Sequence, residues 1–595
     1  MKNPRPTAVG KYSVLALALT ATLVACGGGT VTPVAIELPV LGPATPASFS
    51  GDCTALPGVL ASLPNTTITA ANTVPAGNVA NVATAEHCQL IGRMNQRVSA
   101  IDGNPYYIGF EIRMPKAWNG RFFYQANGGT DGFVSTATGA FGGGATTHAL
   151  AKGFAVLSSD AGHQDRATPF FGLDPQARLD YGYNAVGQLT PMAKSLIKTV
   201  YGKAPDRSYL GGCSNGGRHA LVATTRYADQ YDGILAGAPG YNLPKAAIAQ
   251  LWGVQQYAQI ATGTVTSVAT AAGVTSSVAL PDVSTAFTSA ELAMVSNAIL
   301  GKCDALDGIA DGWAGDVAAC QTAFSVAADV PTCAGARDGT CLTPAQKTVL
   351  TNVHLGAKNK AGAALYSTFS YDMGIRSSGW PSWKFANATG VGRDPGATAF
   401  IFTTAPQSNT TTFTGLPYAL SFDFELDAPK IFSTSGVYTE SAMSFMTPPN
   451  PSDLSKLRDR GAKVMVYHGT SDPVFSFDDT VNWYKGVAGA NNGDASKFAR
   501  LFSVPGMSHC SGGPAADQFD MIEPLVNWVE KGTAPASVTA SARGTGSSAI
   551  AALVNAEVPA TWSANRTRPL CPYPQVARYS GTGDKELASS FSCKI

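Results

Sequence analysis

The sequence Ser208-Tyr209-Leu210-Gly211-Gly212-Cys213-Ser214-Asn215-Gly216-Gly217 decides the fold of this chain. It begins with a short strand-like run and is followed by a helix-like stretch over residues 218–227. Between the two, residues 212–216 match the pattern G-x-S-x-G, in which a serine occupies a strained turn from strand to helix. Glycines are needed beside the serine because side chains there would clash. A glycine-rich turn with an incidental serine has the same pattern, so the interpretation depends on partners elsewhere in the chain.

Strand-like and helix-like segments alternate on both sides of this turn. Strands are predicted over residues 106–114, 121–125, 153–159, 232–238, 463–467 and 499–504, and helices over 185–201, 478–484 and 519–531. Such alternation predicts an α/β fold with a mostly parallel sheet covered by helices.

The alternation fades between residues 243 and 453, where helices rich in alanine, threonine and serine mix with cysteines and an aromatic cluster. We interpret this stretch as a large inserted lid domain between two parts of the core, residues 51–242 and 454–595. The chain has 595 residues, which is long enough for a large core and such an insertion.

The first 26 residues have the pattern of an export signal. A basic start precedes the apolar run 12–25, which is too short to span a bilayer comfortably. The run ends at Cys26 and three glycines, an arrangement that resembles a bacterial lipobox. We expect export to the periplasm, the outer membrane or the medium, with membrane contact only through a lipid on Cys26. Ordinary cleavage nearby is the alternative, and residues 27–50 are predicted to be a flexible tether.

Composition limits the possible partners. Charged residues make up 14% of the chain and the formal net charge is +1. Nucleic-acid binding is excluded because no basic footprint exists to attract phosphates. The sequence does not indicate an oligomeric state.

Ten cysteines remain when Cys26 is set aside, an even number that predicts five disulfides in an exported protein. Neighbouring cysteines suggest the pairs Cys53–Cys88, Cys303–Cys320, Cys333–Cys341 and Cys571–Cys593. Cys213 and Cys510 are left over, either as a fifth disulfide or as two unrelated buried thiols.

Two further motifs supply partners for Ser214. Asp472 follows the predicted strand 463–467, and His509 follows the predicted strand 499–504. The order Ser, Asp, His is the one used by α/β-hydrolases, in which histidine takes the serine proton and the carboxylate orients the histidine. His468 is the rival base. The rival acids are Asp478 and Asp479.

Cys213 precedes the serine and Cys510 follows the histidine, so a disulfide between them would hold nucleophile and base together. These motifs, from Cys213 to Gly217, the Asp472 loop and His509-Cys510, resemble the tannase and feruloyl esterase family. The resemblance extends from about Gly51 to Ile595. It implies an α/β-hydrolase fold and a serine esterase for aromatic acyl esters. It also implies that the backbone N–H groups of Gly129 and Asn215 form the oxyanion hole, with Gly128 as a rival donor.

The segment 303–313 carries three carboxylates within eight residues. Such carboxylates repel one another unless a hard cation lies among them, so calcium is expected. By the resemblance, the ligands would be the carboxylates of Asp304, Asp307 and Asp311 and the carbonyls of Ile309 and Trp313. The alternative is a solvated loop. The role would be structural, and no organic cofactor is expected.

The substrate is predicted to be a small aromatic ester. Trp383 in the lid could stack on a flat acyl group or belong to the lid core. Feruloyl, galloyl and related hydroxybenzoyl or terephthaloyl esters all fit. Between Arg393 and Lys430 the chain has no Arg or Lys, which disfavours terephthalate monoesters, because an arginine usually binds such a free carboxylate. The alternative function is an inactive surface lipoprotein that binds aromatic compounds.

Overall fold

The computed structural model describes residues 37–140, 148–271 and 274–595. Residues Leu38–Ile595 form one compact unit. The predicted signal segment and Cys26 lie outside the described residues. No helix in the described part of the chain is long and apolar enough to cross a membrane.

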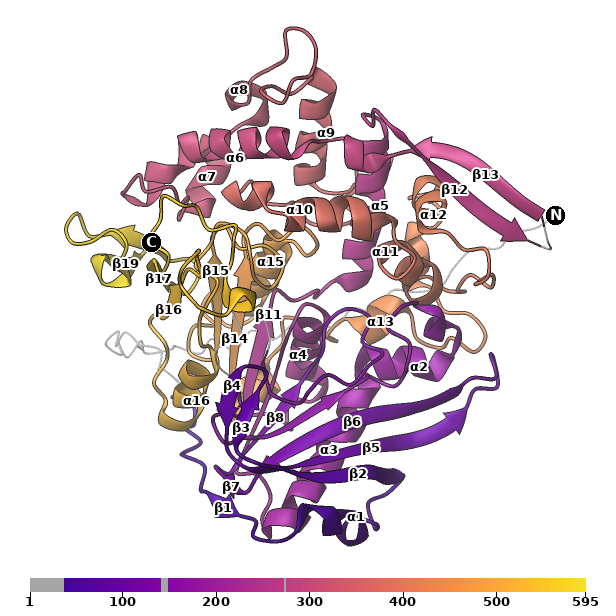
Figure 1. Ribbon diagram of the computed structural model, residues 1–595, viewed down its shortest axis with the longest axis vertical. Helices are drawn as coiled ribbons and strands as arrows, with labels where there is room; N and C mark the ends of the chain where they lie inside the picture. The colour runs from indigo at the N-terminus through magenta and orange to yellow at the C-terminus, as the bar shows by residue number, and fades with distance from the viewer. Residues whose placement is uncertain (1–36, 141–147, 272–273) are drawn as a thin grey trace, which may run out of the picture. The chain divides into compact units, whose positions relative to one another are not determined.

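The core is a nine-stranded, mostly parallel sheet with the strand order β15-β14-β11-β10-β8-β9-β6-β5-β2 (Figure 1). From one edge to the other its strands are β15 (Ala499–Val504), β14 (Lys463–Gly469), β11 (Gly233–Gly237), β10 (Arg207–Cys213), β8 (Arg121–Gln125), β9 (Ala155–Ser159), β6 (Pro105–Pro115), β5 (His87–Val98) and β2 (Thr66–Val74). The six strands from β15 to β9 are parallel, and β6, β5 and β2 continue the sheet as an antiparallel meander. The α/β fold class predicted from the alternation is therefore confirmed.

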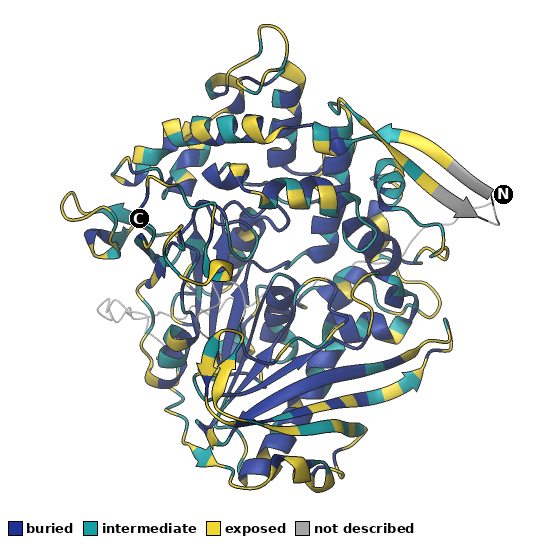
Figure 2. Cartoon of the chain, viewed as in Figure 1, coloured by how far each residue is buried: buried dark blue, intermediate teal, exposed yellow. Residues whose placement is uncertain are grey.

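Burial differs between the two ends of the sheet. Every residue of β11 and β14 is buried, whereas β5 alternates over much of its length between buried and exposed positions (Figure 2). Central parallel strands are covered on both faces and consist of apolar runs, which is why the sequence predicted them. The strands β2 and β5, at the antiparallel end of the sheet, were missed because their polar residues hide the strand pattern.

Four helices pack on the parallel strands. They are α3 (Ala185–Tyr201), α4 (Asn215–Arg226), α15 (Phe477–Gly489) and α16 (Ile522–Lys531). α4 contacts β10 and β11, and α15 contacts β14. The buried face of α3 contains the apolar residues that indicated this helix, and Gly202 ends it with a φ of 75°.

The insertion between β11 and β14 is mainly helical. Its longer elements are α5 (Leu243–Ala258), the hairpin β12 (Thr264–Ala271) and β13 (Val274–Pro281), α6 (Ser289–Cys303), α7 (Val317–Ala323), α9 (Pro344–Leu355), α12 (Gly415–Ser421) and α13 (Ala442–Met446). It meets the core at the carboxyl ends of the strands, where Thr470 donates a hydrogen bond of 2.6 Å to Asp372. The inserted residues belong to the same compact unit as the sheet. Two small antiparallel sheets complete the C-terminal part, formed by β16 (Val538–Ser541) with β17 (Thr567–Leu570) and by β18 (Val576–Tyr579) with β19 (Phe591–Lys594).

The predicted tether is wrong for its second half, because residues from Leu38 onward belong to the folded unit. The backbone N–H of Thr45 donates to Asp206 at 2.7 Å, and that of Ala44 donates to Glu530 at 3.1 Å. β1 (Ala47–Ser48) also pairs with β7 (Ala117–Trp118). Glycine and proline content indicated flexibility, but these long-range hydrogen bonds hold the segment against the core.

All five predicted disulfides are present. They join Cys53 to Cys88, Cys213 to Cys510, Cys303 to Cys320, Cys333 to Cys341 and Cys571 to Cys593. The pairing by sequence neighbourhood is confirmed, and the two remaining cysteines form the long-range bridge.

Candidate functional site

Ser214 lies in the tight turn between β10 and α4. Its backbone has a φ of 67° and a ψ of −127°, a strained conformation for a residue with a side chain. A Cβ atom on Gly212 or on Gly216 would lie 2.3 Å from the carbonyl oxygen of Ala126, so both positions exclude larger residues. The backbone N–H of Ser214 donates to Gly237 at 2.9 Å. The turn is therefore fixed by the two neighbouring strands.

Three side chains from three strand ends meet at this turn. The Oγ of Ser214 lies 2.7 Å from Nε2 of His509, and Nδ1 of His509 lies 2.6 Å from Oδ2 of Asp472. The other oxygen of Asp472 accepts the backbone N–H groups of Val474 at 2.9 Å and Phe475 at 3.0 Å. This chain of contacts can move a proton from the serine to the imidazole while the carboxylate fixes the tautomer.

The pKa of Asp472 reflects these partners. Burial raises it, but the interaction with His509 and the hydrogen bonds from His468 and His509 more than offset burial, so the pKa lies well below its ordinary value. The carboxyl is therefore ionised at neutral pH.

The rival residues make other contacts. His468 is fully buried, with Nδ1 2.9 Å from Oγ1 of Thr480 and Nε2 3.0 Å from the carbonyl oxygen of Phe475. Asp478 accepts hydrogen bonds from the hydroxyls of Thr368 and Ser370, and Asp479 accepts one from Asn242. Nε2 of His468 also lies 3.3 Å from Oδ2 of Asp472, the same oxygen that His509 contacts.

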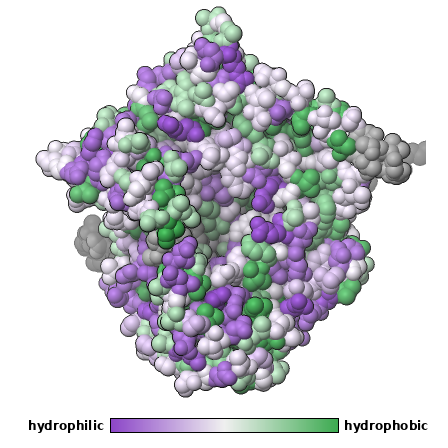
Figure 3. All heavy atoms as spheres, viewed as in Figure 1, coloured by the Kyte–Doolittle hydropathy of each residue, from purple (hydrophilic) through white to green (hydrophobic). Residues whose placement is uncertain are grey.

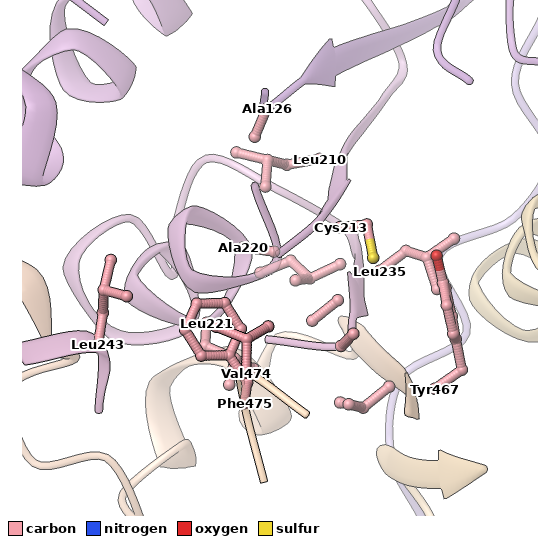
Figure 4. Packing of buried hydrophobic residues seen from close by; sticks show 14 of the residues in the cluster. Ala126, Leu210, Cys213, Ala220, Leu221, Leu235, Leu243, Tyr467, Val474 and Phe475 are labelled. Atoms are coloured by element: carbon pink, nitrogen blue, oxygen red, sulfur yellow. The ribbon is translucent and has the colours of Figure 1, made fainter. Parts of the chain in front are cut away.

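The bridge between Cys213 and Cys510 connects the serine turn to the histidine loop. Cys213 is packed among core residues that include Leu235 and Tyr467 (Figure 4). Since the two cysteines adjoin Ser214 and His509 in sequence, the bridge restrains the distance between these two side chains.

Both residues named for the oxyanion hole lie at the serine. Gly129 and Asn215 line one pocket together with Ser214. Asn215 is the first residue of α4, where backbone N–H groups have no partner within the helix. Gly128, the rival donor, faces the serine too, since a Cβ atom there would lie 3.6 Å from Cβ of Ser214.

The pocket beside Ser214 is narrow and mostly apolar, with a volume of about 50 Å³. Its lining consists of Gly129, Thr130, Tyr181, Ser214, Asn215, Leu243, Trp383, Arg393, Asp394, Ala397, Phe402, Val474 and Phe475. The ring of Trp383 meets that of His509 edge-on at 5.0 Å, and the ring of Phe475 does so at 5.3 Å. A larger cavity of about 520 Å³ beside Trp562 contains none of the triad residues, so its size does not make it the site. On the face in Figure 3 hydrophobic residues are scattered among hydrophilic ones.

Two charged pocket residues, Arg393 and Asp394, were missed by sequence reasoning. Oδ2 of Asp394 is buried and has no hydrogen-bond partner among the described residues. Burial raises the pKa of Asp394 to about 7, although Arg393 and Lys384 oppose that shift. The sequence contains a signal that could have identified them, because Arg393 and Asp394 are the only charged residues between Lys384 and Asp423.

The predicted calcium ligands lie in one loop after α6. An oxygen of Asp304 accepts the backbone N–H groups of Asp311 at 3.0 Å, Gly312 at 2.9 Å and Trp313 at 3.0 Å. Asp311 contacts the guanidinium of Arg568. Within the described ranges, no three His, Cys, Asp or Glu side chains are grouped closely enough to hold a metal ion.

Two features of this loop nevertheless match a cation site in donor chemistry. Oδ1 of Asp311 is buried without a hydrogen-bond partner in the described part of the chain. Burial raises the pKa of Asp307 to about 7, and the nearby carboxylates of Asp311 and Asp304 add to that rise. Ile309 and Trp313, whose backbone carbonyls complete the predicted ligand set, lie in the same loop.

Comparison with known proteins identifies relatives over most of the chain. A family model described as "Tannase and feruloyl esterase" matches residues 88–594. A mono(2-hydroxyethyl) terephthalate hydrolase from Piscinibacter sakaiensis is 42% identical over 541 residues, which cover 86% of this chain and 85% of that protein. A probable feruloyl esterase B-1 from Neosartorya fischeri is 27% identical over 86% of this chain and 87% of that protein.

Solved structures agree on the fold. The crystal structure of feruloyl esterase B from Aspergillus oryzae has a TM-score of 0.68 and 23% sequence identity, and it covers 91% of this chain and all of that one (100%). Tannin acyl hydrolase from Aspergillus niger has a TM-score of 0.63 over 93% of this chain, at 19% identity. This chain belongs to the tannase and feruloyl esterase family of ester hydrolases.

Proposed function

We propose that this protein is an exported serine esterase that hydrolyses aromatic acyl esters through an acyl-enzyme. The observation that carries the proposal is the contact of 2.7 Å between Ser214 and His509, together with that of 2.6 Å between His509 and Asp472. Both distances lie within the range required for proton transfer between nucleophile and base.

In the first half-reaction, Oγ of Ser214 attacks the ester carbonyl carbon and its proton passes to Nε2 of His509. The negative charge that develops on the carbonyl oxygen would be stabilised by the backbone N–H groups of Asn215 and Gly129. The bond to the alcohol oxygen then breaks, and that oxygen takes the proton from His509. In the second half-reaction, water gives a proton to His509 and attacks the acyl carbon, and the proton returns to Ser214 when the acid leaves.

The pocket favours a flat acyl group. Trp383, Phe475 and Phe402 line it, and aromatic rings pack well edge-on or offset against a planar substrate. Feruloyl, galloyl and related hydroxybenzoyl esters fit the unpartnered oxygen of Asp394, which can accept a hydrogen bond from a phenolic hydroxyl. For terephthaloyl monoesters, Arg393 supplies a cation in the pocket that could bind the free carboxylate. Asp394 beside it would repel that carboxylate.

The test is hydrolysis of p-nitrophenyl acetate and methyl ferulate by wild type and Ser214→Ala. We expect turnover by wild type and a loss of at least about 10³-fold in the variant, because nucleophilic attack is removed. Equal inactivity of both proteins, with saturable binding of ferulate, would instead identify a surface protein that binds aromatic compounds without cleaving them.

We also propose a structural calcium ion in the loop after α6. Asp304, Asp307 and Asp311, with the carbonyls of Ile309 and Trp313, would hold it. The ion would neutralise carboxylates that raise one another's pKa in a buried loop. No catalytic step depends on it.

Export is proposed on the strength of the N-terminal sequence and the five disulfides, which persist in oxidising compartments. Lipidation of Cys26 would anchor the protein to a membrane. Mass spectrometry of the mature N-terminus tests this: a diacylglyceryl cysteine supports the anchor, and an unmodified N-terminus beyond Cys26 rules it out.

A further inference from the structure

The side chain of Asn215 is held at both ends, although only its backbone enters the reaction proposed above. Its Nδ2 donates to Oδ2 of Asp131 at 2.7 Å, and its Oδ1 accepts from Nε of Arg218 at 2.6 Å. The amide is fully buried. Since the guanidinium of Arg218 can only donate, the amide oxygen of Asn215 must face Arg218 and its NH₂ group must face Asp131.

Asp131 also belongs to the loop that carries Gly129. Its backbone N–H donates to the carbonyl of Gly128 at 3.3 Å, which closes a turn around Gly129. Asp131 has a φ of 56° in this turn. The hydroxyl of Tyr181 donates to the carbonyl of Gly129 at 3.4 Å. One carboxylate therefore contacts both segments that supply the two oxyanion donors.

The remaining contacts keep Asp131 in place. Nε2 of His219, one turn along α4, lies 3.0 Å from the same oxygen. Burial and the charge of Arg218 hold the pKa of His219 well below its ordinary value, so the ring is neutral and donates one N–H. The guanidinium of Arg218 donates to the carbonyls of Gly182 at 2.6 Å and Tyr181 at 2.9 Å.

We propose that Asp131 is a positioning residue that sets the spacing between the two oxyanion donors, Gly129 and Asn215. It acts through the side chain of Asn215 and touches neither substrate nor reacting atoms. A hydrogen bond across 84 residues of chain joins the loop after β8 to the start of α4, so loss of Asp131 lets the two backbone N–H groups separate. This inference rests on the proposed serine esterase mechanism.

The experiment compares Asp131→Ala and Asp131→Asn with wild type, using p-nitrophenyl acetate as substrate and phenylboronic acid as a mimic of the tetrahedral intermediate. We expect Asp131→Ala to lower kcat about 10- to 100-fold with KM changed little, because oxyanion donors act mainly in the transition state. Binding of the boronic acid should weaken in step with kcat. Asp131→Asn keeps an acceptor for Asn215 and should recover most of the activity.

A double-mutant cycle tests whether Asp131 acts through Asn215. If it does, Asp131→Ala/Asn215→Ala should lower kcat no more than either single variant. Additive effects of the two substitutions would overturn the inference, as would a kcat for Asp131→Ala within twofold of wild type. Should Asp131→Ala fail to fold, Asn215→Ala removes the same hydrogen bond from the other side. It should lower kcat and boronic acid affinity together, and unchanged values of both would overturn the inference.

Asp232 supplies the matched control. It is a buried aspartate paired with Arg460 at 2.7 Å. It also accepts a hydrogen bond of 2.8 Å from the backbone N–H of Ser208, at the start of β10 and thus at the opposite end of that strand from Ser214. Asp232→Ala should lower the unfolding temperature and leave kcat and boronic acid affinity unchanged. If it reproduces the kcat loss of Asp131→Ala, the effect is only structural and the inference fails. Ser214→Ala in the same assay distinguishes failure of this inference from failure of the proposed function. If the proposed function is wrong, wild type will hydrolyse the substrate no faster than Ser214→Ala.

Discussion

Ser214 and Cys510 both have positive backbone φ angles, 67° and 63°, which residues with side chains rarely adopt. At Ser214 the angle aims the hydroxyl away from the sheet toward His509. The neighbouring glycines allow this, because Ala126 approaches so closely that no Cβ atom fits at Gly212 or Gly216. Reactivity at this site therefore depends on backbone conformation as much as on residue identity.

Single residues should also control substrate specificity. Substitutions of Arg393 and of Asp394 are expected to change kcat/KM for a terephthalate monoester in opposite directions. Replacing Arg393 by alanine should lower kcat/KM for a terephthalate monoester about 10- to 100-fold, since a charge-assisted hydrogen bond is lost. Asp394→Asn should raise kcat/KM for the same monoester, because a negative charge leaves the pocket, and lower it for methyl ferulate. Steady-state kinetics with both esters and methyl gallate measure these changes.

The control for both variants is p-nitrophenyl acetate, whose acetyl group carries neither a carboxylate nor a phenolic hydroxyl for these side chains to bind. A uniform change across all four substrates would show that Arg393 and Asp394 support the pocket without reading the acyl group.

The loops after β10, β14 and β15 bring the side chains of Ser214, Asp472 and His509 together. Parallel strands place their carboxyl ends at one edge of the sheet, so residues far apart in sequence meet there. The cysteine bridge joins two of these loops. Cys213 and Cys510 are 297 residues apart, so in the chain-entropy model the bridge contributes about 6 kcal/mol to stability.

Removing this bridge should affect both stability and activity. We expect Cys213→Ala/Cys510→Ala to lower the unfolding temperature and, well below that temperature, to lower kcat, because the Ser214–His509 contact loses its restraint. Cys571→Ala/Cys593→Ala is the comparison: its loop spans 22 residues, it contributes about 3 kcal/mol in the same model, and it lies away from the triad. Circular dichroism melts and initial rates measure both. Equal kcat in the two variants would contradict a restraining role for the first bridge.

Within the insertion, the element η7 (Ser382–Ala386) buries a lysine directly after Trp383. Nζ of Lys384 lies 3.8 Å from the ring centre of Phe369 and 5.4 Å from that of Trp380. Burial lowers the pKa of Lys384 to about 7, although Asp394 and Asp472 oppose the shift. The element therefore holds a group that titrates in a neutral range.

Titration of Lys384 should make the free energy of unfolding depend on pH. In the unfolded chain a lysine has a pKa of about 10.4, so between pH 7 and 10 the unfolded state binds more protons and the free energy of unfolding rises with pH. Lys384→Met should remove this rise, and the variant should gain most over wild type below pH 7. Thermal unfolding from pH 6 to 9.5 measures the difference. Parallel curves for the two proteins would show that Lys384 does not titrate in this way.

At the scale of the whole molecule, the insertion and the small C-terminal sheets meet at the predicted calcium loop. Arg566 and Arg568, from the C-terminal part, approach Asp311 of the insertion, and both guanidiniums are almost fully buried. The charge of this loop therefore influences how firmly these distant segments are held together.

Calcium removal tests that role. Treatment with EDTA should lower the unfolding temperature of wild type, and elemental analysis should find about one calcium per chain, as one site holds one ion. The variant Asp307→Asn distinguishes a loop that binds calcium from one that does not. If calcium binds, this variant is less stable and no longer responds to EDTA; without calcium it is at least as stable as wild type, because it removes a buried carboxylate whose pKa is raised to about 7.

Features that depend on neighbours along the chain could be predicted from the sequence. Glycine spacing around Ser214, the apolar runs of the parallel strands and the helix 185–201 are local patterns, and the order Ser214, Asp472, His509 follows from strands that each end in a loop. Four disulfides join cysteines that are also neighbours in the sequence.

Tertiary structure alone decided the contacts that span distant parts of the chain. The placement of Arg393 and Asp394 in the pocket depends on how the insertion packs over Ser214. The bond between Asp131 and Asn215 depends on the register of β8 beside β10, and the packing of Thr45 depends on Asp206. Periodicity cannot predict such pairs, because which polar groups meet is set by the packing of whole elements and by the need to satisfy each buried donor and acceptor.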